Sequence, residues 1–544
     1  MKQKLFKYIF SIFLLISLCS SFSFSQPVIE WVQRYNSSGS NSDYVTVMTL
    51  DKTGNVYLAG YIKNNDTMNS FLTLKYNSNG NFQWARTYNC MGGWDGASGI
   101  VVDSFGNVYV TGRSDTINPS HSNMPYFAII KYSDNGDLLW IRKYINPDSI
   151  YALPNAICID DSSNIYVTGD SYSNTQNSNY TTVKYNKDGQ FIWSRFYDVA
   201  NNYDVPWSIV CKNNFIYITG GTSGSYANTL KYNLNGDLLL TANFIGQGKK
   251  IAVDDSNSIY VGGEKLVNGY YVFKTNKYDS SGVLQWTKIF QDTNWYNSAN
   301  YLRDMCIDRN GNTFVTGYSP RDAPSGGYSY VTIKYNSFGD SLWTRIYKSA
   351  YHSNDQVESI TTDKFGNVYV TGSSDNNLIW THYATVKYNS QGVRQWVANY
   401  NNNNEFSNHY GNIVRVDTTG NIYVTGNSEG SGTGMDIATI KYSVSTGIRN
   451  ITSEIPGENK LFQNYPNPFN ASTKIEFTIK ENGAVQLVVF DILGRKVNSL
   501  VDGYKTAGKY ETVFDASNLS SGIYFYRLSF KEEIIDNKKL FLIK

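Results

Sequence analysis

The chain has 544 residues and a formal net charge of +2, and 15% of its residues are aromatic, with 45 tyrosines. This length allows several domains or one long repeat array. The near-neutral charge argues against a nucleic-acid-binding protein, because Lys/Arg clusters are confined to the extreme N-terminus, and the tyrosine-rich composition favours β-strands.

The N-terminus has the pattern of a secretory signal peptide. Three lysines precede the apolar run from Tyr8 to Leu18, and small residues follow that run. We expect residues 1–25 to be a signal peptide and the mature chain to begin near Gln26. Cys19 suggests a lipoprotein as an alternative, but a lipid-acceptor cysteine normally follows a small residue and not leucine. Because no other stretch approaches the roughly 20 apolar residues of a membrane span, we expect no transmembrane segment in the mature chain.

A unit that recurs about every fifty residues organises most of the chain. Its clearest copy runs from Asp363 to Gly372, and each copy ends in Tyr/Phe-x-x-Gly. Four short strand signals follow one another in each unit, as a propeller blade requires. We therefore predict an all-β fold with an eight-bladed β-propeller over residues 26–442. The eight units end at Gly60, Gly112, Gly169, Gly220, Gly263, Gly317, Gly372 and Gly426.

The two ends of this array complement each other. The segment Trp31 to Tyr35 matches the fourth-strand motif of the units but precedes the first unit. The last unit, Ile413 to Tyr442, lacks a fourth strand. We predict that the N-terminal strand completes the last blade, because this closure leaves no free sheet edge.

The units resemble the bacterial SBBP β-propeller repeats. The resemblance rests on segments such as Asp103-Ser-Phe-Gly-Asn-Val-Tyr-Val-Thr-Gly112 and Ala384-Thr-Val-Lys-Tyr-Asn389, and it covers residues 29–442. The family name implies seven blades. Seven blades therefore stay an alternative to eight, because the unit from Asn213 to Gly248 is degenerate.

Features that all units share are interpreted as architecture, since a ligand site normally breaks the symmetry of its scaffold. The Asp363-to-Asn367 segment and its copies lack the carboxylate series of a calcium loop and predict Asx-type turns. The recurrent lysine, such as Lys387, is expected to bond turn carbonyls or turn aspartates. We predict no metal site and no cofactor, with a cation near the channel mouth as an alternative.

Aromatic residues and histidines gather in the long loops on one face of the predicted propeller. A glycan or peptide could bind such a face, although the loops of an aromatic-rich chain also collect these residues by chance. The candidate ligand-binding residues are Trp94, Trp207, Trp295, Trp380, His352, His382 and His409.

An acidic residue also recurs eight positions before the turn, at Asp43, Asp95, Asp204 and Asp355. We favour loop capping for these residues, because acceptors near turn N–H groups need no metal. The alternative is an extracellular glycan hydrolase or lyase with Asp95, Asp204 and Asp355 as catalytic carboxylates. No Ser-His-Asp order, zinc spacing or phosphate loop is recognisable. The leading prediction is therefore a binding or scaffold module and not an enzyme.

Three cysteines lie in apolar strand-like segments of different units. Cys158, Cys211 and Cys306 match no metal-ligand spacing. Export would permit a disulfide, but we expect small buried apolar side chains at all three positions.

The pattern changes after Tyr442. Residues 443–460 are predicted to be a linker, and the short alternating strands of residues 461–544 predict a small Ig-like β-sandwich. This segment closely resembles the type A C-terminal sorting domain of proteins exported by the type IX secretion system of Bacteroidota-like bacteria. The resemblance rests on Asn464-Tyr-Pro-Asn-Pro-Phe-Asn470, Phe490-Asp-Ile-Leu-Gly-Arg-Lys496 and Leu519-Ser-Ser-Gly-Ile-Tyr524.

The resemblance implies recognition by the type IX machinery at the outer membrane, then release or surface attachment, often after cleavage of the domain. We therefore expect a secreted or cell-surface protein, monomeric, with no nucleic-acid partner. The sorting-signal residues that the resemblance implies are Asn464, Pro466, Pro468, Gly494, Arg495, Gly522, Tyr524 and Lys544.

Overall fold

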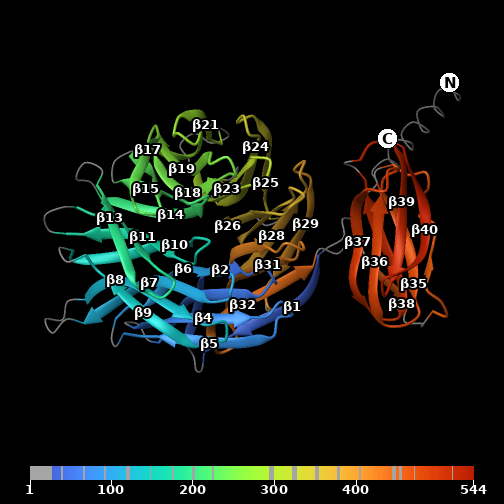
Figure 1. Cartoon of the computed structure of the whole chain (residues 1–544), viewed down its shortest axis with the longest axis horizontal. Coiled ribbons are helices and arrows are strands. Elements are labelled where there is room, and N and C mark those ends of the chain that lie inside the picture. Colours follow the sequence, from blue (N-terminus) through green and yellow to red (C-terminus); the bar gives the residue numbers. More distant parts are fainter. Residues whose placement is uncertain are drawn as a thin grey trace, which may run out of the picture. The chain divides into compact units, whose positions relative to one another are not determined.

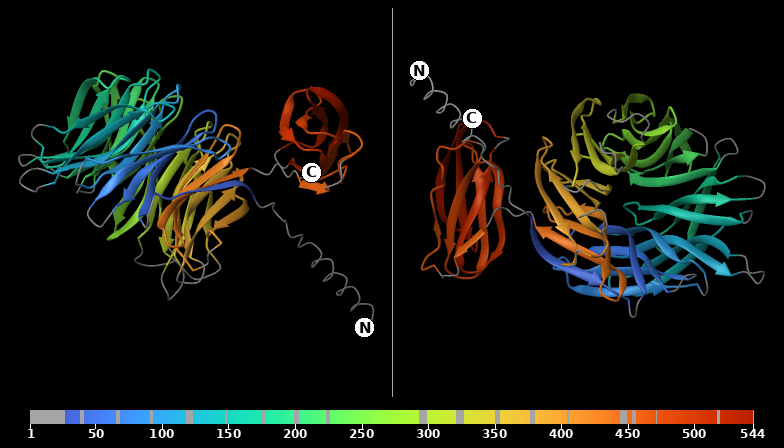
Figure 2. Two further views of the ribbon diagram at one scale, coloured as in Figure 1. Left: turned by 90° about the horizontal axis from the view of Figure 1, so that it is seen from below. Right: turned by 180° about the vertical axis from the view of Figure 1, so that it is seen from behind.

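The computed structural model shows two units built from strands (Figures 1 and 2). The first comprises Pro27–Ser443, and the second comprises the residues after Ser443. No helix that could cross a membrane occurs in the described ranges. The structure describes residues 27–37, 41–64, 68–90, 93–117, 123–146, 149–173, 177–198, 203–222, 226–292, 299–320, 327–349, 354–375, 380–403, 406–443, 449–452, 456–470, 472–516 and 519–543.

The first unit is a β-propeller in which four-stranded antiparallel sheets follow one another along the chain, numbered sheet 1 to sheet 8. Their strands are, for sheet 1, β2 (Ser42–Leu50), β3 (Val56–Lys63), β4 (Asn69–Tyr76) and β5 (Phe82–Tyr88); for sheet 2, β6 (Gly96–Val102), β7 (Val108–Ile117), β8 (Asn123–Tyr132) and β9 (Leu138–Tyr144); for sheet 3, β10 (Tyr151–Ile159), β11 (Ile165–Tyr172), β12 (Asn179–Tyr185) and β13 (Phe191–Tyr197); for sheet 4, β14 (Asp204–Lys212), β15 (Phe215–Thr222), β16 (Tyr226–Asn233) and β17 (Leu238–Ile245). They continue, for sheet 5, with β18 (Gln247–Val253), β19 (Ile259–Val267), β20 (Tyr270–Tyr278) and β21 (Leu284–Phe290); for sheet 6, β22 (Tyr301–Ile307), β23 (Thr313–Pro320), β24 (Tyr328–Tyr335) and β25 (Ser341–Tyr347); for sheet 7, β26 (Asp355–Thr362), β27 (Val368–Asp375), β28 (Thr381–Tyr388) and β29 (Arg394–Tyr400); and for sheet 8, β30 (His409–Val416), β31 (Ile422–Gly430), β32 (Gly434–Ser443) and β1 (Val28–Tyr35).

The N-terminal strand closes the ring, as the sequence predicts. β1 runs antiparallel to β32, with Trp31 opposite Lys441 and Tyr35 opposite Ile437. Sheet 8 therefore combines the two ends of the propeller sequence. In Figure 1 first strands such as β6, β10 and β14 lie toward the middle of the ring, and fourth strands such as β9 and β13 lie toward its rim.

The repeated turn is an Asx-type turn, as predicted. Asp363 Oδ1 accepts hydrogen bonds from the backbone N–H groups of Phe365 and Asn367 at 2.9 and 3.0 Å. Gly366 has a φ of 76°, which glycine adopts without a steric cost. The Tyr369 hydroxyl donates to Asp363 Oδ2 at 3.0 Å, so the turn is tied to the buried second strand.

In most sheets the repeated lysine and tryptophan bond a turn of the next sheet. Lys334 Nζ and Trp343 Nε1 both donate to the carbonyl of Ser390, in the turn between the third and fourth strands of sheet 7, at 3.1 and 3.2 Å. Arg345 Nε donates to the Gly392 carbonyl of the same turn at 2.6 Å. The predicted lysine-to-carbonyl bond is therefore confirmed, and it crosses from one sheet to its neighbour.

Two of the cysteines form a disulfide, so the expectation of buried apolar thiols was wrong for this pair. Cys158 on β10 and Cys211 on β14 are bonded, with their Cα atoms 5.7 Å apart. Both lie near the ends of the first strands of consecutive sheets, and those strands are neighbours in the ring. Cys306 is a free thiol, and burial raises its pKa.

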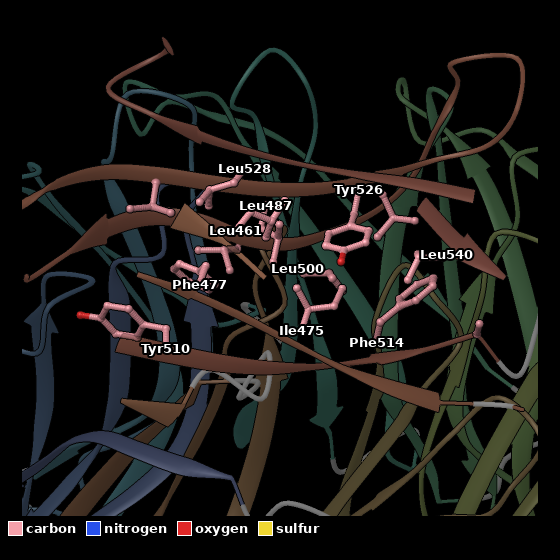
Figure 3. Close-up of a cluster of buried hydrophobic side chains, with 14 of the residues drawn as sticks. Leu461, Ile475, Phe477, Leu487, Leu500, Tyr510, Phe514, Tyr526, Leu528 and Leu540 are labelled. Carbon is pink, nitrogen blue, oxygen red and sulfur yellow. The ribbon is translucent and has the colours of Figure 1, made fainter. Parts of the chain in front are cut away.

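The second unit contains two four-stranded sheets around one apolar core. Figure 3 shows Ile475 and Phe514 of one sheet together with Leu487 and Leu528 of the other. β33 lies inside the stretch expected to be a linker and pairs with β38, so this unit begins before residue 461. The strands are β33 (Arg449–Thr452), β34 (Lys460–Leu461), β35 (Ser472–Ile479), β36 (Gly483–Phe490), β37 (Lys496–Lys505), β38 (Gly508–Asp515), β39 (Gly522–Phe530) and β40 (Glu533–Leu542).

Candidate functional site

Every first strand of the propeller contains a β-bulge at the same place. In sheet 4, Pro206 pairs with Gly220 and Ser208 with Thr219, which leaves Trp207 as the extra residue. A bulge re-aims its extra side chain while the strand pairing continues on both sides. Since first strands of neighbouring sheets lie side by side, these residues form one ring around the channel. The bulge residues are Thr46, Ser98, Asn155, Trp207, Lys249, Arg303, Glu358 and Asn412.

Half of this ring links neighbouring sheets. In sheets 8, 1, 2 and 3 the bulge residue is small and polar, and its side chain donates to the carbonyl just before the bulge of the next sheet. These hydrogen bonds are Asn412 Nδ2 to Val45 O (3.3 Å), Thr46 Oγ1 to Ala97 O (2.7 Å), Ser98 Oγ to Pro154 O (2.7 Å) and Asn155 Nδ2 to Pro206 O (3.0 Å).

The other half of the ring departs from this pattern. Sheets 4 to 7 place Trp207, Lys249, Arg303 and Glu358 at the bulge. The residue after the bulge changes in the same four sheets. It is Ser208, Lys250, Asp304 or Ser359 there, but Val47, Gly99, Ala156 or Ile413 elsewhere.

The altered half faces a cavity of about 960 Å³, which occupies the central channel of the propeller between the first strands. Trp207 and the Arg303–Glu358 pair line one part of its wall, and Tyr410 and Arg415 of sheet 8 line another. The cavity therefore combines an aromatic ring with charges of both signs, the mixture by which pockets orient polar ligands.

Ion pairs between neighbouring strands organise the charged wall. Arg303 binds one oxygen of Glu358 through Nε and Nη2, at 2.9 and 2.5 Å, across sheets 6 and 7. Lys249 Nζ lies 2.7 Å from Glu264 on β19. Burial raises the pKa of both carboxyl groups, and the paired cations oppose the shift.

A second set of polar interactions connects sheets 5 to 8. Lys250 Nζ lies 3.4 Å from Asp304 Oδ1. Asp304 Oδ2 accepts hydrogen bonds from Ser359 Oγ and the Ile360 N–H at 3.1 and 3.0 Å. Arg415 Nη1 donates to Ser359 Oγ at 3.3 Å, so the chain of polar interactions ends on a guanidinium.

The Trp207 indole lies against Gly221 of β15, a residue without a side chain. A Cβ atom at Gly221 would lie 2.6 Å from Cη2 of the indole. The equivalent position after the repeat glycine is Tyr61 in sheet 1 and Glu264 in sheet 5. Gly221 thus gives the indole room against the backbone of β15.

The recurrent aspartates lie in four different sheets, and all are buried. Asp43 accepts hydrogen bonds from the N–H and hydroxyl of Ser37 at 2.6 and 2.7 Å. Asp95 accepts the Cys90 N–H at 3.0 Å, and Asp355 accepts the Ser349 N–H at 2.8 Å. These three carboxylates thus hold the loop that enters their own sheet, and Asp204 lies at the same position of sheet 4.

Most candidate ligand residues of the loop face lie apart from the cavity. Trp94 packs against Tyr61 in a tilted arrangement with ring centroids 5.6 Å apart, and Trp380 is half-buried before β28. His409 is fully buried and hydrogen-bonded to Ser407 and Ser428. His382 is 8% exposed, and burial together with the charge of His409 lowers its pKa to about 4. Trp207 alone among the described candidates lines the cavity, whereas Trp295 and His352 lie outside the described residues.

Several sorting-motif residues hold the second unit together. The Asn464 N–H donates to the Tyr526 hydroxyl at 2.8 Å, and its side-chain amide donates to Pro466 O at 3.0 Å. Arg495 Nε lies 2.7 Å from Asp491 Oδ2 across a turn in which Gly494 has a φ of 76°.

The remaining sorting-motif residues have varied places. Pro468 lies in the connection before β35, Gly522 begins β39, and the Tyr524 hydroxyl donates to Ser520 O at 2.9 Å. Ile492 and Leu493 at the Asp491 turn are exposed. Lys544 lies outside the described residues.

Sequence reasoning missed Lys249, Arg303, Glu358 and Arg415. The available signal was variation: these positions differ among units whose neighbouring residues recur. Among the described residues no group of three or more His, Cys, Asp or Glu side chains is arranged to hold a metal ion.

Comparisons with curated proteins and solved structures find distant resemblances only. The chain matches no curated protein. Among solved structures it resembles Sqt1 from Chaetomium thermophilum (9% identity, TM-score 0.44, covering 76% of this chain and 100% of that one) and a protein of unknown function from Bacteroides caccae (11%, 0.31, 51% and 92%). It also resembles the polysaccharide lyase Uly1 (12%, 0.39, 64% and 90%). At these values the resemblances carry no argument.

Family models match both units. Residues 96–118 and 342–379 match the SBBP beta-propeller repeat, and residues 463–543 match the secretion system C-terminal sorting domain. The chain is therefore a β-propeller repeat protein with a type IX C-terminal sorting domain, which marks it for export to the cell surface or for secretion.

Proposed function

We propose that the exported propeller is a binding module whose ligand occupies the central channel. One observation carries this proposal: the bulge position and the position after it both lose the repeat pattern in the same four consecutive sheets. The bulge residues there are Trp207, Lys249, Arg303 and Glu358. A ligand site breaks the symmetry of its scaffold, whereas the small polar bulge residues elsewhere close the ring. The sorting domain would deliver this site outside the cell.

Several features support binding in preference to scaffolding alone. Lys249, Arg303 and Glu358 line the cavity at positions where small polar residues are enough to join neighbouring sheets elsewhere in the propeller. Trp207 adds an indole face beside these charges. In sheets 1 and 2, Thr46 and Ser98 join neighbouring first strands, so the propeller does not need charged or aromatic bulge residues for this purpose.

The test is a glycan and peptide array probed with the exported protein and two tryptophan variants. Trp207→Ala should lose the bound spots, because it removes the aromatic face of the channel. Trp94→Ala is the matched control, since Trp94 lies on a loop and not in the channel wall. Loss of binding in the control alone would move the site to the loop face, and an array without bound spots would contradict a binding role.

A further inference from the structure

The charges around the cavity leave one cation in excess, and that cation is Arg415. Lys249 pairs with Glu264, Lys250 with Asp304, and Arg303 with Glu358. Arg415 makes no ion pair with any described residue. Its Nη1 donates to Ser359 Oγ at 3.3 Å and to the Val414 carbonyl at 2.8 Å.

A guanidinium without an ion-pair partner is suited to bind a carboxylate. Arg415 is half-buried in the cavity wall, so a bound anion would be partly shielded from water. Its planar fork can donate two parallel hydrogen bonds to the two oxygens of one carboxylate.

The rest of the wall is suited to a hydroxylated ring. Trp207 offers an indole face, and the side-chain amides of Gln247 and Gln356 offer both donors and acceptors. Glu358 accepts hydrogen bonds, which ligand hydroxyl groups can donate. An acidic peptide would bring carboxylates but few hydroxyl donors.

We infer that the channel binds an oligosaccharide of uronic acids, with a sugar ring on Trp207 and a sugar carboxylate on Arg415. This inference rests on the proposed binding function and adds the chemical class of the ligand. Each ring of such a ligand combines one carboxylate with several hydroxyl groups.

The test compares oligogalacturonate with the same oligomer after its carboxyl groups are reduced to alcohols. Calorimetry with the full exported chain should show at least about tenfold tighter binding of the acidic oligomer, and the difference should shrink with added salt. Arg415→Gln should bring the two affinities within about twofold of each other, whereas Trp207→Ala should weaken both. Arg415→Lys keeps the charge and should retain part of the preference, which covers the case in which the glutamine variant fails to fold.

Other outcomes separate the two proposals. Equal affinity for the acidic and reduced oligomers would overturn the uronic-acid inference and leave the binding module standing. Tighter binding of an oligoglutamate peptide than of the uronic oligomer would overturn the saccharide class. Absence of binding to both oligomers would overturn the inference, while the array decides separately whether the channel binds another ligand.

Discussion

Arg34 on the closing strand donates to the Asp436 carboxylate on β32 at 2.6 Å. The same guanidinium donates to the hydroxyl of Ser428 on β31 at 2.5 Å and to that of Tyr400 on β29 at 3.2 Å. One side chain therefore joins β1 to its own sheet and to sheet 7. The fourth-strand arginine of other sheets, such as Arg345, lies one position earlier in the motif and bonds the turn of the next sheet instead.

Removing residues 26–36 should destabilise the propeller by several kcal/mol, because the β1–β32 pairing and the Arg34 hydrogen bonds are lost together and the edge of β32 is exposed. Arg34→Met tests one part of this closure. It should cost about 3 kcal/mol, since it leaves the buried Asp436 carboxylate without its cation. Chemical denaturation measures both effects, and a truncated chain as stable as the full one would contradict closure by β1.

Loss of the Cys158–Cys211 disulfide should also destabilise the propeller. The bond joins residues 53 positions apart, and a cross-link of that loop length is worth about 2–4 kcal/mol. A Cys158→Ala/Cys211→Ala variant should melt lower than the wild type, and a reductant should lower the melting temperature of the wild type but not that of this variant. Cys90→Ala is the control, because Cys90 is a free thiol, and this variant should respond to the reductant as the wild type does. If a reductant leaves the melting temperature of the wild type and of both variants unchanged, the disulfide does not stabilise the propeller.

Stability should fall as the pH drops from about 6.5 to 4, because His382 is buried in the neutral form. Its pKa lies near 4 in the folded state, so the unfolded chain takes up the proton first. The contribution of neutral His382 to the unfolding free energy is complete above about pH 6.5. About 3 kcal/mol of it is lost as the pH falls through the folded pKa. His382→Gln should flatten this part of the curve of unfolding free energy against pH. An unchanged curve would show that His382 is not its source.

Gly221 should act on ligand binding through Trp207. Gly221→Ala places a Cβ atom 2.6 Å from the indole and should displace it, which lowers affinity about tenfold or more with little change in stability. In a double-mutant cycle, Gly221→Ala combined with Trp207→Ala should bind no more weakly than Trp207→Ala alone. Additive losses would contradict this coupling. Tryptophan fluorescence offers a second measure of the displaced ring.

The propeller should not need the sorting domain for its stability. The two units have separate cores, and the ring is closed by its own N-terminal strand. Removing residues 444–544 should leave the melting of the propeller unchanged and abolish delivery to the cell surface. Cell fractionation and thermal melting measure the two results. Normal surface delivery would contradict the sorting role, and a large loss of stability would show that the units fold as one.

Much of the fold could be predicted from the sequence because its signals recur. The turn at Asp363 and the orphan strand at Trp31 are explicit in the residue pattern, and the structure shows both the turn and the β1–β32 pairing. The disulfide could not be predicted in the same way. Burial of Cys158 is visible in its apolar segment, but its pairing with Cys211 depends on which first strands are neighbours in the ring.

The channel site was harder to predict for a geometric reason. A bulge adds one residue to a strand without changing the composition of the segment around it, so Arg303 and Glu358 look like ordinary strand residues in sequence. Aromatic residues in loops are easier to notice, and of the candidates they supplied, Trp207 lines the cavity. Its loop-like flanking sequence concealed that it is a bulge within β14.

The bulge also affects how such a protein can evolve. Because strand pairing resumes on both sides of the extra residue, the side chain at Thr46 or Lys249 can change without disturbing the hydrogen-bonded ladder. Each repeat thus supplies one position whose side chain can change while the strand pairing is kept, and in sheets 4 to 7 that position lines the cavity. Duplication of a repeat would copy that position, and later divergence would adapt it independently. A ring built this way can acquire a new specificity one substitution at a time.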